Sequence, residues 1–157
     1  GRNGMDPWPG RAAGIAHDLC KDLPREEQRA LAALYPGSVA ASSLMADKVL
    51  HGPAAAAVLA RDYGVRDEPI LEAVAYHTIG RVGMGALASV VYCADKLEPG
   101  RTGIDPGFRA ECALLPPERM LAAVVGRIIE WYGSRGKAVA PETIVLYNSL
   151  ADGAVAT

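Results

Sequence analysis

The chain has 157 residues, half of them hydrophobic, which is enough to bury the core of one domain. Its formal net charge of −2 argues against a nucleic-acid-binding surface, and no run of about 18 apolar residues is present that could span a membrane. The cysteines, Cys20, Cys93 and Cys112, are odd in number and widely spaced. This usage is typical of reduced thiols in a cytoplasmic protein and not of a disulfide framework or a zinc ribbon.

Helix signals recur along the chain, whereas no alternating apolar and polar run is long enough to predict a strand. Prolines in first turns and glycines after last turns predict helices over residues 7–20, 24–35, 54–63, 67–77 and 84–97. Residues 38–49 are compatible with a loop or a short helix. The later part should hold a short helical segment over 109–114, helices over 118–132 and 141–150, and a frayed tail over 151–157. The expected fold class is all-α.

His17 is followed directly by Asp18, and Lys21 comes one turn later. If the first helix continues through this stretch, the three side chains lean toward one side, because successive residues turn by about 100°. A neutral imidazole and a carboxylate can bind the same divalent cation, and a carboxylate has two oxygens with which to bridge two cations. The alternative is a buried histidine beside a helix-capping aspartate.

The other two histidines, His51 and His77, also lie in unusual places. His77 continues an apolar stripe of its helix, so its ring should face the core. His51 precedes the Gly-Pro pair that opens the next helix, whose positive end disfavours an imidazolium. Both rings are therefore expected to be neutral and suited to a metal.

Asp95 follows Val91 by four residues and Ala88 by seven, at the edge of the expected apolar face of the 84–97 helix. A desolvated carboxylate costs several kcal/mol unless a cation or strong hydrogen bonds compensate it. An ion pair with Lys96 or Arg81 is one solution, and a metal is the other.

Taken together, these residues form an ordered set of nitrogen and oxygen donors on separate helices. His51 lies 34 residues after His17, His77 a further 26, and Asp95 a further 18. Such a mixed set suits iron, manganese or zinc better than calcium or a thiolate-held metal. From the residues alone, the chain is predicted to be a metal-assisted hydrolase of a phosphate ester or anhydride.

Several segments resemble the HD-domain metal-dependent phosphohydrolases, and more narrowly the YqeK-like symmetrical bis(5′-nucleosyl)-tetraphosphatases. They are His-Asp within residues 13–23, His-Gly-Pro at 51–53, His-Thr-x-Gly-Arg at 77–81, Asp-x-x-Glu-Pro-Gly-Arg at 95–101, and Pro141-Glu142-Thr143 with Tyr147-Asn148. The resemblance implies an HD-domain helical bundle, and a substrate, diadenosine tetraphosphate, that is cut symmetrically into two ADP molecules.

The resemblance also implies a two-metal centre, with iron expected first and manganese or zinc as alternatives. Asp18 would bridge the metals, His17 and Asp95 would hold one, and His51 and His77 would hold the other. A hydroxide formed from metal-bound water would attack phosphorus, with no covalent enzyme intermediate.

Lys21, Arg81 and Arg101 are the cations expected to hold the phosphates, with the backbone amides after His51 as a further seat. The alternative for each arginine is a surface salt bridge, with Glu98 as an obvious partner of Arg101. An apolar slot for the purine is also required, and the sequence does not assign one.

The family carries a further metal-binding histidine on an earlier helix, and no histidine precedes His17. Residues 1–157 are therefore expected to form a single HD domain without its first helix. A nucleoside 5′-monophosphatase and a non-catalytic nucleotide-binding regulatory module remain alternatives, as does a purely structural bundle. The expected partner is a nucleotide, with neither nucleic acid nor membrane, and a homodimer is left open.

Overall fold

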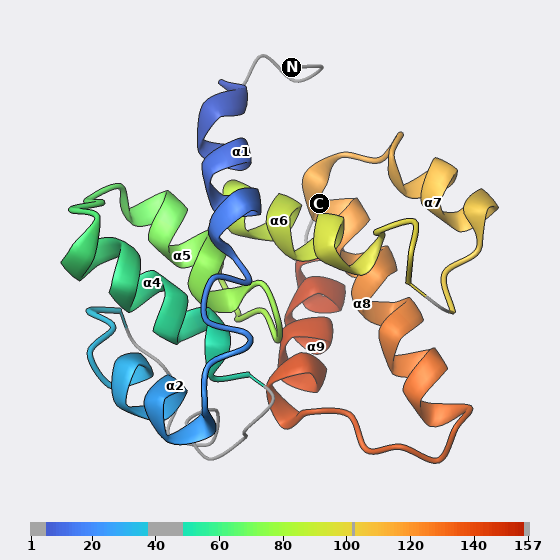
Figure 1. The fold of residues 1–157 in the computed structure, drawn as a ribbon. Coiled ribbons are helices and arrows are strands. Elements are labelled where there is room, and N and C mark those ends of the chain that lie inside the picture. Colours follow the sequence, from blue (N-terminus) through green and yellow to red (C-terminus); the bar gives the residue numbers. More distant parts are fainter. Residues whose placement is uncertain (1–5, 38–48, 102, 156–157) are drawn as a thin grey trace.

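The computed structural model describes the backbone of residues 6–37, 49–101 and 103–155, and all regular structure in these ranges is helical (Figure 1). The all-α prediction is thus confirmed. In chain order the helices are α1 (Pro7–Ala16), α2 (Arg25–Ala32), α4 (His51–Asp62), α5 (Glu68–Tyr76), α6 (Ala86–Lys96), α7 (Pro106–Cys112), α8 (Pro117–Gly133) and α9 (Pro141–Val155).

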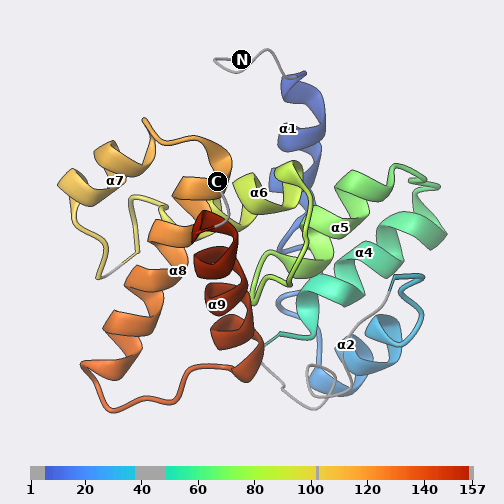
Figure 2. The ribbon, with the colours of Figure 1, turned by 180° about the vertical axis from the view of Figure 1, so that it is seen from behind.

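Hydrophobic side chains of the described residues form two clusters that share α6. The first is built by α1, α2, α4 and α5 with Ala88 and Val91 of α6. The second is built by α7, α8 and α9 with Tyr92 and Cys93 of α6. In Figures 1 and 2, α6 accordingly lies between the α4–α5 side and the α8–α9 side. None of the helices in the described ranges combines the length and apolarity needed to cross a bilayer.

The first helix is shorter than predicted. It begins as expected, with Pro7 in its first turn and the Asp6 carboxylate accepting from the Trp8 backbone amide, but it ends at Ala16 and not near Cys20. Beyond it the backbone makes tighter turns, in which Leu19 N donates to Ala16 O and Lys21 N to Asp18 O. The chain can therefore change direction at His17 and Asp18.

The apolar face of α6 was predicted only in part. Ala88 and Val91 are buried as expected, but Ala94 is exposed, whereas Tyr92 and Cys93 are buried. The reason is that α6 is covered on two sides, by α5 and by α8, so a single stripe cannot describe its burial.

Other boundaries also differ from expectation. The short segment expected over 109–114 is helix α7, which starts at Pro106 because the Asp105 carboxylate caps the Phe108 amide. Helix α9 continues to Val155, through residues expected to fray. The ambiguous stretch 38–49 lies outside the described residues except for Val49.

Gly52 lets the start of α4 approach the end of α5 closely. A β-carbon at this position would lie 2.7 Å from the backbone oxygen of Ala75 and 3.0 Å from that of Val74. We expect Gly52→Ala to destabilise the fold by about 1–3 kcal/mol, because backbone atoms cannot yield as a flexible side chain would. Urea unfolding measures this change.

Gly14 provides the matched control, because a β-carbon there meets nothing within 4 Å. Gly14→Ala in α1 should be neutral or stabilising by up to about 1 kcal/mol, through helix propensity. Equal effects of the two substitutions would contradict the close approach of α4 and α5.

Candidate metal centre

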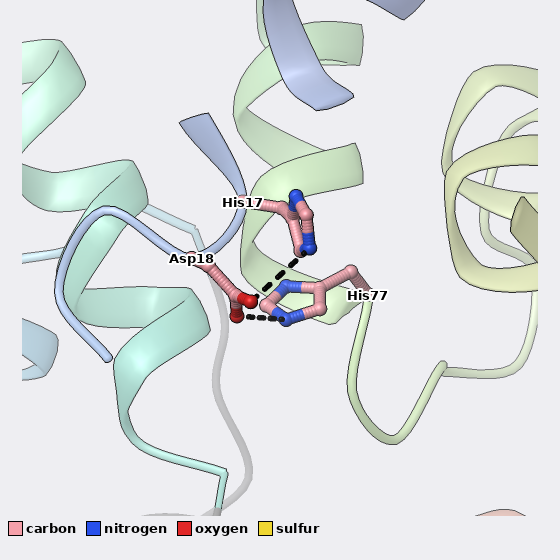
Figure 3. Close-up of side chains that lie close together, drawn as sticks. All are labelled: His17, Asp18 and His77. Carbon is pink, nitrogen blue, oxygen red and sulfur yellow. Dashed lines mark ion pairs between the residues drawn. The ribbon is translucent and has the colours of Figure 1, made fainter. Parts of the chain in front are cut away.

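The five predicted ligands come from four places in the chain and meet at helix ends. His17 caps the end of α1 and Asp18 follows it, His51 is the first residue of α4, and His77 caps the end of α5. Asp95 lies one residue before the end of α6. Figure 3 shows three of them, His17, Asp18 and His77, pointing toward one another.

Asp18 lies at the centre of this group, with its two carboxylate oxygens facing different partners. Oδ1 is 3.4 Å from Nε2 of His51 and 3.7 Å from Nε2 of His77. Oδ2 is 3.5 Å from Nε2 of His17, which in turn is 3.9 Å from Oδ1 of Asp95. One carboxylate thus lies between a His51–His77 pair and a His17–Asp95 pair.

Two of the three histidines are oriented by their backbone. Nδ1 of His17 is 2.7 Å from the carbonyl oxygen of Gly14, and Nδ1 of His77 is 2.8 Å from that of Val74. A carbonyl only accepts, so each Nδ1 carries the proton and each Nε2 keeps a free lone pair. A hydrogen bond from Nδ1 to a backbone carbonyl is a usual way in which a metal-binding histidine is oriented.

The spacing of the donors fits a divalent cation. One donor atom each from His17, Asp18 and His77 can be chosen so that all lie within 4.8 Å of one another. Nε2 of His51 lies 3.0 Å from Nε2 of His77. At metal–nitrogen distances of about 2.0–2.1 Å, two imidazoles at a right angle have their nitrogens about 3 Å apart. The residues present therefore fit a metal.

The protonation states are also those that a metal requires. Burial lowers the pKa of His51, and it lowers the pKa of His77 to about 4, so both rings are neutral near pH 7. Burial alone would raise the pKa of Asp18, but the hydrogen bond from Lys21 and the positive charge of Lys21 oppose burial, and the pKa is lowered.

Asp95 is held by two cations. Its Oδ2 accepts from Nζ of Lys96 at 2.7 Å and its Oδ1 from Nη2 of Arg101 at 2.5 Å. Burial opposes ionisation of this carboxylate, but Lys96 and Arg101 outweigh burial and lower the pKa of Asp95 to about 2. The Lys96 ion pair, weighed above as an alternative to a metal, is thus present, whereas the pair with Arg81 is not.

The three predicted phosphate-binding cations are placed differently. Lys21 donates to Oδ2 of Asp18 at 2.7 Å and is more than half exposed. Arg101 contacts Asp95 and not the Glu98 side chain, which was considered as its alternative partner. Arg81 pairs with Glu72 and lies over the Tyr76 ring, which is the surface salt bridge considered as its alternative.

Two residues of the site, Thr78 and Lys96, were not among the predicted ligands or phosphate-binding residues. Oγ1 of Thr78 lies 3.1 Å from Nε2 of His77 and 3.4 Å from Nε2 of His51. Nζ of Lys96 donates to the backbone oxygen of His77 as well as to Asp95, and so joins α5 to α6. In the sequence, Thr78 appeared only within the His-Thr-x-Gly-Arg segment and Lys96 only as an alternative ion-pair partner of Asp95.

Comparison with known proteins agrees with this geometry. The chain is 34% identical to the symmetrical bis(5′-nucleosyl)-tetraphosphatase of Bacillus subtilis (strain 168), over 97% of this chain and 81% of that protein. It is 36% identical to the protein of the same name from Staphylococcus aureus, over 59% of this chain and 48% of that protein.

A solved structure from Clostridium acetobutylicum, described as a predicted HD superfamily hydrolase involved in NAD metabolism, superposes with a TM-score of 0.79. It is 27% identical and the match covers 96% of this chain and 79% of that one. The sequence model of the HD domain matches residues 9–100, which include all five predicted ligands. The chain therefore belongs to the HD domain family.

Proposed function

We propose that the protein is a metal-dependent hydrolase that cuts diadenosine tetraphosphate symmetrically into two ADP molecules. The observation that carries the proposal is the position of the Asp18 carboxylate between two pairs of ligands, with Oδ1 toward His51 and His77 and Oδ2 toward His17. The names of the relatives from B. subtilis and S. aureus support the substrate.

In this proposal His51 and His77 hold one divalent metal, His17 and Asp95 hold the other, and Asp18 contacts both. The mixed donor set suits iron, manganese or zinc, and the family resemblance puts iron first. Two such ions, when bound, supply a water of lowered pKa and neutralise charge on the phosphates. The expected further histidine on a helix before Gly1 stays a prediction.

The protein's own side chains orient the substrate. Lys21 lies beside Asp18 and is exposed, so its ammonium group can reach a phosphate oxygen above the centre. Arg101 and Lys96 lie on the Asp95 side and offer further donors. These cations hold the tetraphosphate so that its central bridge lies over Asp18, and they stabilise the charge that gathers on the phosphate oxygens.

We also place the protein in the cytoplasm. Its three cysteines, Cys20, Cys93 and Cys112, are free and buried, and burial raises the pKa of each thiol. Thiols of this kind are typical of a reducing compartment.

Product analysis tests the reaction. Incubation with diadenosine tetraphosphate should yield ADP alone, because the cut is symmetric. Release of AMP with ATP would contradict the symmetric cut. Release of inorganic phosphate from a nucleoside 5′-monophosphate, without cleavage of the dinucleotide, would favour the monophosphatase. No turnover by metal-loaded protein would favour the regulatory module.

Substitution of Asp18 tests the centre. Asp18→Asn keeps the shape of the side chain but removes the charge that both metals share, so we expect metal content to fall to background in elemental analysis. Asp62→Asn is the matched control, because Asp62 is an exposed carboxylate paired with Arg61. The Asp62→Asn protein should keep the metal content of the unmodified protein. Full loading of the Asp18→Asn protein would overturn the bridging role.

Substitution of Lys21 tests the phosphate contact. Lys21→Ala should keep the metal content and lower kcat about 100-fold or more, as expected for a donor that stabilises transition-state charge. Lys21→Arg should recover part of the rate, and Arg61→Ala, on a distant exposed cation, should leave it unchanged. Loss of metal from Lys21→Ala would instead mean that Lys21 acts through Asp18.

A further inference from the structure

We propose that one nucleoside of the substrate binds in a cavity of about 960 Å³ beside the metal centre, with Trp131 as part of its wall. The inference rests on the proposed function for the identity of the nucleotide. It assigns the purine slot that the sequence left unassigned. The cavity lies against α6, α8 and the segment that leads into α9.

The cavity adjoins the metal centre through three side chains that belong to both. Thr78 lines the cavity and lies within 3.4 Å of both His51 and His77. Lys96 and Arg101 also line it, and each contacts the Asp95 carboxylate. The cavity is therefore directly adjacent to the side chains that surround the proposed metal positions.

The charges in the cavity match a nucleotide. The ammonium group of Lys96 and the guanidinium group of Arg101 lie at its boundary with the metal centre, and Arg127 also lines it. Glu142 is the one carboxylate among the lining residues that the structure describes. Phosphates are thus favoured at the end next to Asp95.

The remaining wall suits a base and not a further phosphate. It is built mainly of aliphatic and aromatic side chains, among them Tyr92, Ile128, Trp131 and Tyr132. Its volume is within the range of about 300–1,000 Å³ that holds drug-sized ligands, and aromatic side chains give a base a surface on which to stack. In a symmetric cut, two phosphates separate the nucleoside from the broken bond, and they would extend past Thr78, Lys96 and Arg101.

Trp131 itself shows an unmet hydrogen bond. Its indole Nε1 is buried and has no hydrogen-bond partner among the residues that the structure describes. The loop backbone approaches it at Gly103, where a β-carbon would lie 2.1 Å from Nε1 and where φ is +95°. The Gly103 loop therefore covers Nε1, so Trp131 contributes ring surface to the cavity wall and no hydrogen bond to a ligand there.

Fluorescence tests the slot directly, because Trp8 and Trp131 are the two tryptophans of the chain. Trp8 is exposed and does not line the cavity, so Trp8→Phe leaves Trp131 as the single reporter. In Mn²⁺-loaded Trp8→Phe protein we expect ADP to change the Trp131 emission saturably, whereas pyrophosphate, which lacks the nucleoside, should not. An emission that ADP does not change, in protein that binds ADP by calorimetry, overturns the proposal.

A pair of identical substitutions provides the second test. Val139 is half-buried and lines the cavity, whereas Val145 is exposed on α9 and does not. Val139→Phe should weaken ADP binding about tenfold or more in calorimetry and leave pyrophosphate binding unchanged, and Val145→Phe should alter neither. Equal ADP affinity in both variants overturns the proposal.

The result is separable from the proposed reaction. If the Val139→Phe and Val145→Phe variants cleave diadenosine tetraphosphate with the same KM, the proposed function is supported and the slot is refuted. If the Trp131 emission responds to ADP but not to pyrophosphate, and the protein does not cleave the dinucleotide, the slot is supported and the proposed function is refuted.

Discussion

The interactions of the Asp18 carboxylate govern the arrangement of the site. This carboxylate is only partly exposed and lies within 3.7 Å of three imidazole nitrogens. It stays ionised because Lys21 donates to it at 2.7 Å and brings a positive charge beside it. A charge so placed requires a positive partner, and a metal cation is the partner that could lie between this carboxylate and the lone pairs of the rings from α4 and α5.

The helices meet this requirement by ending at the site. Inside an α-helix the backbone groups are paired with one another, but at an end they are free to orient side chains. The carbonyl oxygens of Gly14 and Val74 do this for His17 and His77. The close approach of Gly52 to the end of α5 then brings His51 to within 3.0 Å of His77.

Much of this could be predicted from the sequence, and the limits are physical. Proline and glycine positions predicted most of the helices, because helix signals are local. The order of the histidines and aspartates, together with the family resemblance, predicted the five residues that converge. The end of α1 at Ala16 was missed because the turns after it depend on tertiary packing around Asp18. The burial of Tyr92 and the cavity beside Trp131 were missed because both depend on α8 packing against α6, far apart in sequence.

The ion pairs that Asp95 makes with Lys96 and Arg101 do not prevent Asp95 from also binding a metal. A buried carboxylate needs a compensating cation under all conditions, and Lys96 and Arg101 supply it in the absence of any ion. Because Arg101 is exposed and Lys96 is buried, the two can respond differently when a further cation arrives. Lys96 also donates to the carbonyl oxygen of His77, whereas Arg101 belongs to a surface loop and, among the described residues, donates to Asp95 alone, through its backbone oxygen and its carboxylate. The same residues that keep Asp95 ionised can therefore also attract the anionic substrate.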